Sequence, residues 1–254
     1  MKKNWFVNKN MVILGRYKNS IKATMMWAVS RLKYIKHLFL TVIFNLWTGY
    51  VFAWQSPYPS HTRVIINQHN SMSGELMLHN PGGRVWLAQS WLEDEKGIIS
   101  GTVLPSLVRL EQQFSNKIRI TPYVNLMQGN TEKILWLNVK FIPTTNKNDD
   151  NKLVIPIIYK MKVFIRPKRL SNEENKVSLN CLKLNEKWIL INNSRYYLSL
   201  VRIFSNEGGW GTQSPLILAP LQRYDLDVIR TDGKYYFEYI NDLGETKAGD
   251  FICH

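Results

Sequence analysis

Histidines and clustered carboxylates are the side chains of this chain best suited to catalysis or metal binding, and their spacing supports neither role. The five histidines are His37, His61, His69, His79 and His254. They lack metal-ligand spacing, and the sequence motifs of serine hydrolases, zinc proteases and nucleotide-binding enzymes are missing. Glu93-Asp94-Glu95 reads as a solvated acidic turn, with nothing that places two carboxylates across a cleft. We therefore predict a non-enzyme with no catalytic residue, no metal and no cofactor.

A second set of polar side chains stands out because apolar strand patterns surround it. Its members are Arg63, Glu132, Lys162, Arg166 and Asp242. A charge inside a half-buried strand needs a partner, because burying it unpaired is very costly. Each of these residues alone would more often point at solvent, so their interest lies in their occurrence together.

Residues 151–167, NKLVIPIIYKMKVFIRP, contain two of these charges. An apolar run from Leu153 to Ile158 is followed by alternation, with Lys160 and Lys162 set between apolar neighbours. Period-two alternation of β-branched and aromatic residues predicts a half-buried strand.

The rest of the chain consists of short β-like runs separated by turn residues. We expect earlier strands at 62–66, 74–79, 85–92, 117–121 and 134–142, and later strands at 187–192, 196–204, 215–218, 224–229, 235–240 and near Phe251. About seven strands in about 110 residues are typical of an immunoglobulin-like sandwich. The polar stretch 168–176 separates this unit from a second all-β unit, and no long amphipathic helix is evident.

The net charge of +14 comes largely from one end of the chain. Residues 1–53 carry nine Lys or Arg and no acidic residue, whereas the remainder has 24 basic and 19 acidic residues. A basic excess confined to one segment gives little support for nucleic-acid binding, and we predict none.

That segment has the pattern of a secretory signal peptide. A basic region is followed by an apolar run from Leu38 to Ala53, and Val51 and Ala53 make a cleavage site before Trp54. The alternative is a membrane anchor, but the run is short for a span. We expect a cleaved signal over 1–53, no stable membrane insertion afterwards, and a true start at Met25 or Met26 as an alternative to Met1.

Cys181 and Cys253 are the two cysteines of the chain. An oxidising compartment after export favours a disulfide between them, and two buried thiols are the alternative.

Eight short motifs, in order and at matching spacing, resemble the periplasmic chaperones of the chaperone–usher pilus pathway from about residue 60 to 252. They are Thr62-Arg63-Val64-Ile65, Leu87-Ala88-Gln89-Ser90-Trp91, Arg109-Leu110-Glu111, Leu135-Trp136-Leu137-Asn138-Val139 with Ile142-Pro143, Lys162-Val163-Phe164-Ile165-Arg166-Pro167, Tyr196-Tyr197, Leu218-Ala219-Pro220 and Ile240-Asn241-Asp242. The resemblance implies an all-β fold of two immunoglobulin-like domains in a boomerang, 54–167 and 168–254. It also implies a periplasmic chaperone that folds and caps pilin subunits and delivers them to an outer-membrane usher.

The resemblance assigns the binding roles. Arg63 and Lys162 would anchor the C-terminal carboxylate of the pilin. Leu153, Ile155 and Ile157 lie two residues apart and so on one face, and they would be lent to the pilin as a missing strand. From the sequence alone these three could equally pack in their own core; the resemblance favours donation. Pro156 departs from the pattern because it removes one N–H from a strand whose purpose is pairing.

The remaining assignments are structural or concern the usher. Glu132, Arg166 and Asp242 would form a salt-bridge network between the domains. An apolar patch of Leu87, Pro105, Ile142 and Pro143 would face the usher. The short loop from Thr144 to Lys152 favours the short F1–G1 loop subgroup, and a Cys181–Cys253 bridge would join the first and last strands of the second domain. The alternative function is a secreted two-domain adhesive or structural protein that keeps its own strand.

Overall fold

The computed structural model describes residues 55–144, 153–170, 177–205, 215–226 and 233–254. The predicted signal peptide with its alternative starts lies outside the described residues, and so does nearly all of the loop whose length favours the short-loop subgroup. Both remain predictions.

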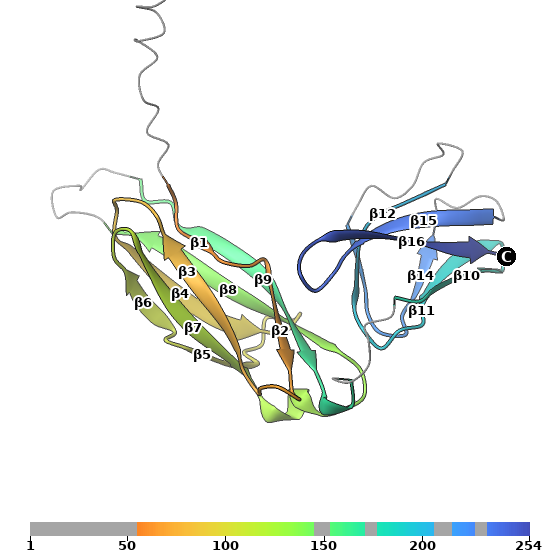
Figure 1. The fold of residues 1–254 in the computed structure, drawn as a ribbon, viewed down its shortest axis with the longest axis horizontal. Coiled ribbons are helices and arrows are strands. Elements are labelled where there is room, and N and C mark those ends of the chain that lie inside the picture. The colour runs from red at the N-terminus through yellow and green to blue at the C-terminus, as the bar shows by residue number, and fades with distance from the viewer. Residues whose placement is uncertain (1–54, 145–152, 171–176, 206–214, 227–232) are drawn as a thin grey trace, which may run out of the picture. The chain divides into compact units, whose positions relative to one another are not determined.

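The first part of the described chain is a sandwich of two sheets (Figure 1). A four-stranded sheet has the order β1-β3-β7-β5, and a five-stranded sheet has the order β2-β9-β8-β4-β6. Their strands are β1 Tyr58–Pro59, β2 Arg63–Asn67, β3 Gly74–Asn80, β4 Trp86–Glu93, β5 Gly101–Leu104, β6 Leu107–Leu110, β7 Phe114–Pro122, β8 Lys133–Pro143 and β9 Ile157–Arg166. A 3-10 helix, η1 Val124–Met127, lies between β7 and β8.

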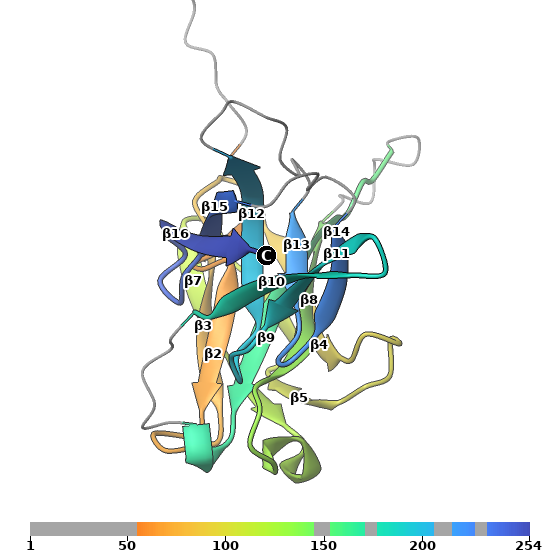
Figure 2. The same cartoon turned by 90° about the vertical axis from the view of Figure 1, so that its right-hand side faces the viewer.

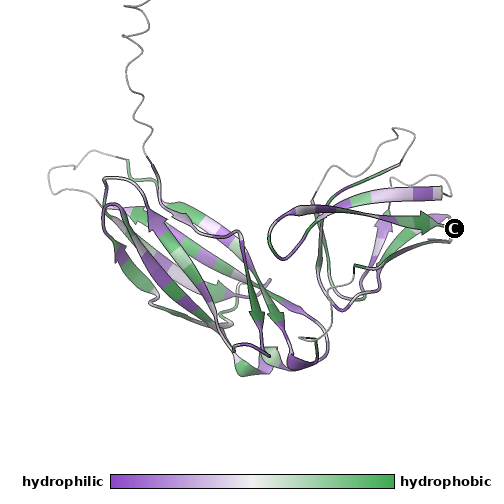
Figure 3. Cartoon of the chain, in the orientation of Figure 1, coloured by the Kyte–Doolittle hydropathy of each residue, from purple (hydrophilic) through white to green (hydrophobic). Residues whose placement is uncertain are grey.

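Alternation along the strands builds the core of this sandwich. In β2, Val64 and Ile66 are buried while Arg63, Ile65 and Asn67 are partly exposed. In β3 and β4, too, buried residues alternate with more exposed ones, and Figure 3 colours these strands by hydropathy. Because successive side chains point to opposite faces, one face of each sheet meets the other sheet and the second face remains accessible.

The last part of the described chain forms a second sandwich around its own core (Figure 2). Its seven strands make one sheet of order β13-β12-β15-β16-β10-β11-β14. They are β10 Leu179–Leu184, β11 Lys187–Asn192, β12 Leu198–Ser205, β13 Leu216–Leu218, β14 Arg223–Leu226, β15 Gly233–Ile240 and β16 Thr246–Cys253, preceded by the 3-10 helix η2 Lys168–Leu170. All seven strands contribute buried residues to one core, as a sheet that folds over itself must.

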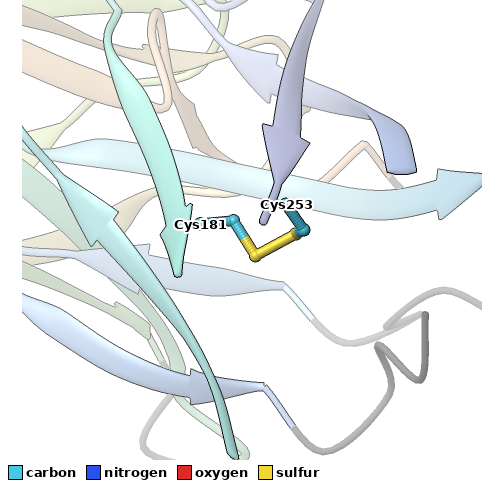
Figure 4. Close-up of a disulfide and its surroundings, with 2 residues drawn as sticks. All are labelled: Cys181 and Cys253. Carbon is cyan, nitrogen blue, oxygen red and sulfur yellow. A yellow bond between two sulfur atoms is a disulfide. The ribbon is translucent and has the colours of Figure 1, made fainter. Parts of the chain in front are cut away.

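The predicted disulfide is present and links two neighbouring strands in the middle of this second sheet. Cys181 of β10 and Cys253 of β16 are register partners in a parallel pairing, and their sulfur atoms are 2.02 Å apart (Figure 4). The alternative of two buried thiols is therefore wrong.

β9 differs from the predicted strand in its first residue. It begins at Ile157, and the four residues from Leu153 to Pro156 lie outside any strand. The last pair between β9 and β8 is Ile157 with Phe141, although β8 itself continues to Pro143. β2 pairs with β9 only from Lys162 to Arg166, so the half from Ile157 to Met161 has a strand partner on one side only within the described residues.

Within the described residues no helix has the length and apolar character needed to cross a membrane.

Candidate functional site

The site begins with two cations held side by side by strand register. Arg63 opens β2 and Lys162 lies in the middle of β9, and the parallel pairing of these strands makes the two residues register partners. Paired residues on neighbouring strands point to the same face, about 4.8 Å apart along the hydrogen-bonding direction. The flanking Val64 and Val163 enter the core, so both cations lie on the outer face of the five-stranded sheet.

The guanidinium of Arg63 is fixed by backbone carbonyls of the second sandwich. Its Nη1 donates to the carbonyl oxygens of Asn241 at 2.9 Å and Ile240 at 3.3 Å, and its Cζ lies 5.8 Å from the ring centroid of Phe164. Its Nε is buried without a hydrogen-bond partner. Burial lowers the pKa of Arg63, against the opposing charges of Asp242 and Glu132.

Lys162 is held more loosely. Its Nζ donates a long hydrogen bond of 3.4 Å to Oγ of Ser199. Burial, and after it the charge of Arg63, lower the pKa of Lys162. In the ion pairs of the described residues, neither Lys162 nor Arg63 has a carboxylate partner. Two half-buried neighbouring cations without a counter-ion form a site that favours an anion, and a carboxylate matches this geometry.

A complete ion-pair network lies next to these cations. Arg166, at the end of β9, donates from Nε to Oε1 of Glu132 at 2.7 Å, and from Nη1 and Nη2 to the two oxygens of Asp242 at 2.6 and 2.8 Å. The other oxygen of Glu132 accepts from the backbone N–H of Tyr197 at 2.7 Å, and the Glu132 N–H donates to the carbonyl of Arg195. The three residues that were predicted to form a salt-bridge network are thus in contact. Two backbone groups of the second sandwich also bond to Glu132.

The two acids of this network are buried to different degrees. The side chain of Glu132 is 2% exposed, that of Arg166 is 11% exposed and that of Asp242 is 38% exposed. Burial raises the pKa of Glu132, and the charge and hydrogen bond of Arg166 oppose this effect. The pKa of Arg166 lies above its ordinary value, because the hydrogen bonds and charges of the two acids outweigh its own burial.

The recess beside these groups is lined by Arg63 of the cation pair and by the ion-pair network. Arg63, Phe164, Arg166, Tyr197, Leu198 and Asp242 are among its lining residues. It therefore combines an unpaired cation with a neutralised network and apolar walls.

The residues predicted to be lent as a strand have unequal environments. Leu153 and Ile155 are 86% and 66% exposed, whereas Ile157 is partly buried against the core of the first sandwich. The alternative in which all three pack in their own core is therefore wrong for the first two. In β9, every second side chain faces the core, namely those of Ile157, Tyr159 and Met161. Leu153 and Ile155 continue this series of odd-numbered residues before the strand begins.

One residue of the patch predicted to face the usher is not accessible. Leu87 and Ile142 are register partners with partly exposed side chains, and Pro105 is exposed, but Pro143 is buried. Pro143 shares the parity of Val139 and Phe141, which point into the core. Including Pro143 in the patch was wrong, and counting along the strand from Leu137 would have shown it.

Several groups at the site were missed by reasoning from the sequence. The carbonyls of Ile240 and Asn241 have no sequence signal, because every residue carries a carbonyl. The resemblance gives the Tyr196-Tyr197 motif no role, and its second residue donates its backbone N–H to Glu132. Among the described residues, no group of three or more His, Cys, Asp or Glu is placed to hold a metal ion.

Comparison with known proteins defines the class first. The crystal structure of the Pseudomonas aeruginosa CupB2 chaperone superposes with a TM-score of 0.65 at 22% identity, covering 78% of this chain and 100% of that one. The fold is therefore that of the chaperones built from two immunoglobulin-like β-sandwiches.

Sequence similarity then identifies the family. Residues 58–171 match the family described as "Pili and flagellar-assembly chaperone, PapD N-terminal domain". The "Probable fimbrial chaperone YfcS" of Escherichia coli (strain K12) is 29% identical over 215 residues, which are 80% of this chain and 84% of YfcS. "Protein FasE" of Escherichia coli is 33% identical over 136 residues, which are 51% of this chain and 99% of FasE. The chain belongs to the family of periplasmic chaperones that assemble pili by the chaperone–usher pathway, a family without enzymatic activity.

Proposed function

We propose that this chain binds fimbrial (pilin) subunits in the periplasm through the anchor formed by Arg63 and Lys162. It also binds them through the first half of β9, Ile157 to Met161, which has a strand partner on one side only. The subunit's terminal carboxylate sits between the two cations, and its last strand pairs with β9. Leu153, Ile155 and Ile157 then fill the groove that the subunit exposes. The capped subunit is delivered to an outer-membrane usher, and no chemical step is catalysed.

The observation that carries this proposal is the neighbouring pair of cations without a carboxylate. Burial and the charge of Arg63 lower the pKa of Lys162, so the protein holds the pair at a cost that a bound anion would offset. Lys162 of the anchor lies on β9, the strand whose first residues would be lent, so the anchor fixes the register of the bound subunit, and register decides which side chains of that strand meet the groove.

The exposed apolar residues before β9 support the second half of the proposal. Fully burying an aliphatic side chain contributes about 1.5–3 kcal/mol. Leu153 and Ile155 gain nothing of this kind in the free protein, because they are mostly exposed. A protein that used its own strand to complete its own sandwich would bury them, so this exposure disfavours the adhesive or structural alternative.

The remaining assignments are proposed on position. The first domain spans 54–167 and the second spans 168–254, in keeping with the end of β9 at Arg166 and the start of β10 at Leu179. Residues 1–53 direct export. Leu87, Pro105 and Ile142 contact the usher.

Co-expression with fimbrial subunits of the same genome tests the function. The chaperone is purified by a tag, and the co-purified subunit is quantified. We expect Arg63→Ala and Lys162→Ala to lose about 10- to 100-fold in affinity, because each removes a charge-assisted hydrogen bond of about 1.5–3 kcal/mol.

Lys140→Ala is the matched control, since Lys140 is a partly exposed cation on the outer face of the same sheet. Circular dichroism checks that each variant keeps its fold. Undiminished subunit recovery with both anchor variants would refute the proposed function.

A further inference from the structure

The half of β9 that has one strand partner presents a specific set of backbone groups. Arg166 accepts a hydrogen bond at its carbonyl oxygen from the N–H of Gln68, which follows β2. The backbone groups of Arg166 therefore point toward β2 and away from β8. Since N–H and C=O groups alternate sides along a strand, every even-numbered residue of β9 has the same orientation.

This alternation in the direction of the backbone groups continues without a break to the first residue of β9, Ile157. The pairs with β8 run from Lys133 with Ile165 to Phe141 with Ile157, with no shift between them. Ile158 and Lys160 consequently point their N–H and C=O groups at the open edge, where β2 does not reach. These groups are available to an added strand.

The side chain of Lys160 does not obstruct this edge. Its Nζ is 3.0 Å from Oε1 of Glu93 and 5.3 Å from the ring centroid of Trp136. Both partners lie on strands on the β8 side, so the lysine is drawn over the sheet and away from the open edge.

Pro156 is the next even-numbered residue, and it is exposed immediately before β9. If the strand is extended by one residue when a partner adds to it, the nitrogen of Pro156 faces that partner. A proline nitrogen carries no hydrogen, and its ring occupies the space where a donor would lie.

We propose that Pro156 interrupts the backbone ladder that this chaperone offers to a fimbrial subunit, by removing one hydrogen-bond donor from it. The inference rests on the proposed function and sharpens it. Ile158 and Lys160 supply both a donor and an acceptor to the added strand, whereas Pro156 supplies its carbonyl oxygen alone, so Leu153 and Ile155 must hold the subunit mainly through their side chains. The segment that precedes the proline is therefore the part of the donated strand that backbone hydrogen bonds hold least.

Pro156→Ala tests the inference by restoring the missing donor. We expect the subunit that co-purifies with the wild-type protein to dissociate about 2- to 10-fold more slowly from this variant, as one added hydrogen bond predicts. Hydrogen exchange measured on the complex gives a direct second readout, since the new amide of residue 156 should become protected only when the subunit is bound.

Two further comparisons fix the cause. Pro215→Ala, at an exposed proline of the second sandwich, should leave dissociation unchanged. Ile158→Pro removes a donor from the same edge and should release the subunit faster than Ile158→Ala, which keeps the N–H. Unchanged dissociation with an unprotected amide at 156, in a complex that still forms, overturns this inference and leaves the proposed function standing. Absence of any complex with the wild-type protein refutes both.

Discussion

Replacing Arg166 by alanine should destabilise the protein far more than removing Asp242, although both changes break the same ion-pair network. Arg166→Ala leaves the Glu132 carboxylate, 2% exposed, with only the N–H of Tyr197 as a hydrogen-bond partner. An uncompensated buried charge costs about 3–5 kcal/mol. Asp242→Ala removes a partner that is 38% exposed, and Arg166 keeps its bond to Glu132, so about 1 kcal/mol is expected.

The assay is urea unfolding followed by tryptophan fluorescence, combined with amide hydrogen exchange. The amides of Glu132 and Tyr197 are the reporters, because each donates across the junction between the two sandwiches. Both should exchange faster in Arg166→Ala and stay nearly unchanged in Asp242→Ala.

A rescue separates charge burial from lost packing. Glu132→Gln in the Arg166→Ala background removes the stranded charge while keeping the shape, and it should recover most of the loss in the free energy of unfolding. The protein that carries Arg166→Ala alone should also become more stable as pH falls. Burial raises the pKa of Glu132, so its folded state binds the proton more tightly than the unfolded state does. A loss below about 1 kcal/mol, or no recovery with glutamine, would refute this reasoning.

Two further predictions concern the disulfide and the anchor. Cys181→Ala with Cys253→Ala opens a loop with a sequence separation of 72 and should lower the free energy of unfolding of the second sandwich by about 4 kcal/mol, measured by urea denaturation; a change below about 1 kcal/mol would contradict it. The lowered pKa of Lys162 predicts that subunit binding weakens as pH rises through that pKa, at lower pH than for an ordinary lysine. The free protein should gain stability over the same range, since its folded state holds this proton less tightly than the unfolded state. Lys162→Met should abolish both pH effects; if it retains them, the titrating group is another residue.

The longer strands could be predicted because their alternation is long enough to recognise. The pattern over 187–192 predicted β11 with its observed bounds, Lys187–Asn192. The predicted strands do not include β5, β6 or the six-residue β10; β5 and β6 have four residues each, and Pro105 lies in the turn between them. Sheet pairing creates such short strands, and a window of four residues carries too little periodicity to show them.

The site was less accessible to sequence reasoning than the fold. Arg63 and Lys162 become neighbours only through the register of two parallel strands that are far apart in the chain, and no local pattern encodes that register. Their selection came from the family resemblance. The bonds of Arg63 to the Ile240 and Asn241 carbonyls depend on how the two sandwiches pack, which alternation along a strand does not describe.

Binding of a synthetic peptide that copies the last strand of a fimbrial subunit tests the central claim most directly. The peptide is prepared with a free C-terminal carboxylate and with a C-terminal amide, and titration calorimetry measures its affinity for the wild-type protein and for Lys162→Ala. We predict that amidation weakens wild-type binding about 10- to 100-fold and changes the affinity of the variant little, because the carboxylate and the lysine act on each other. Equal losses on amidation in both proteins would show that Lys162 does not hold the carboxylate, and would contradict the account.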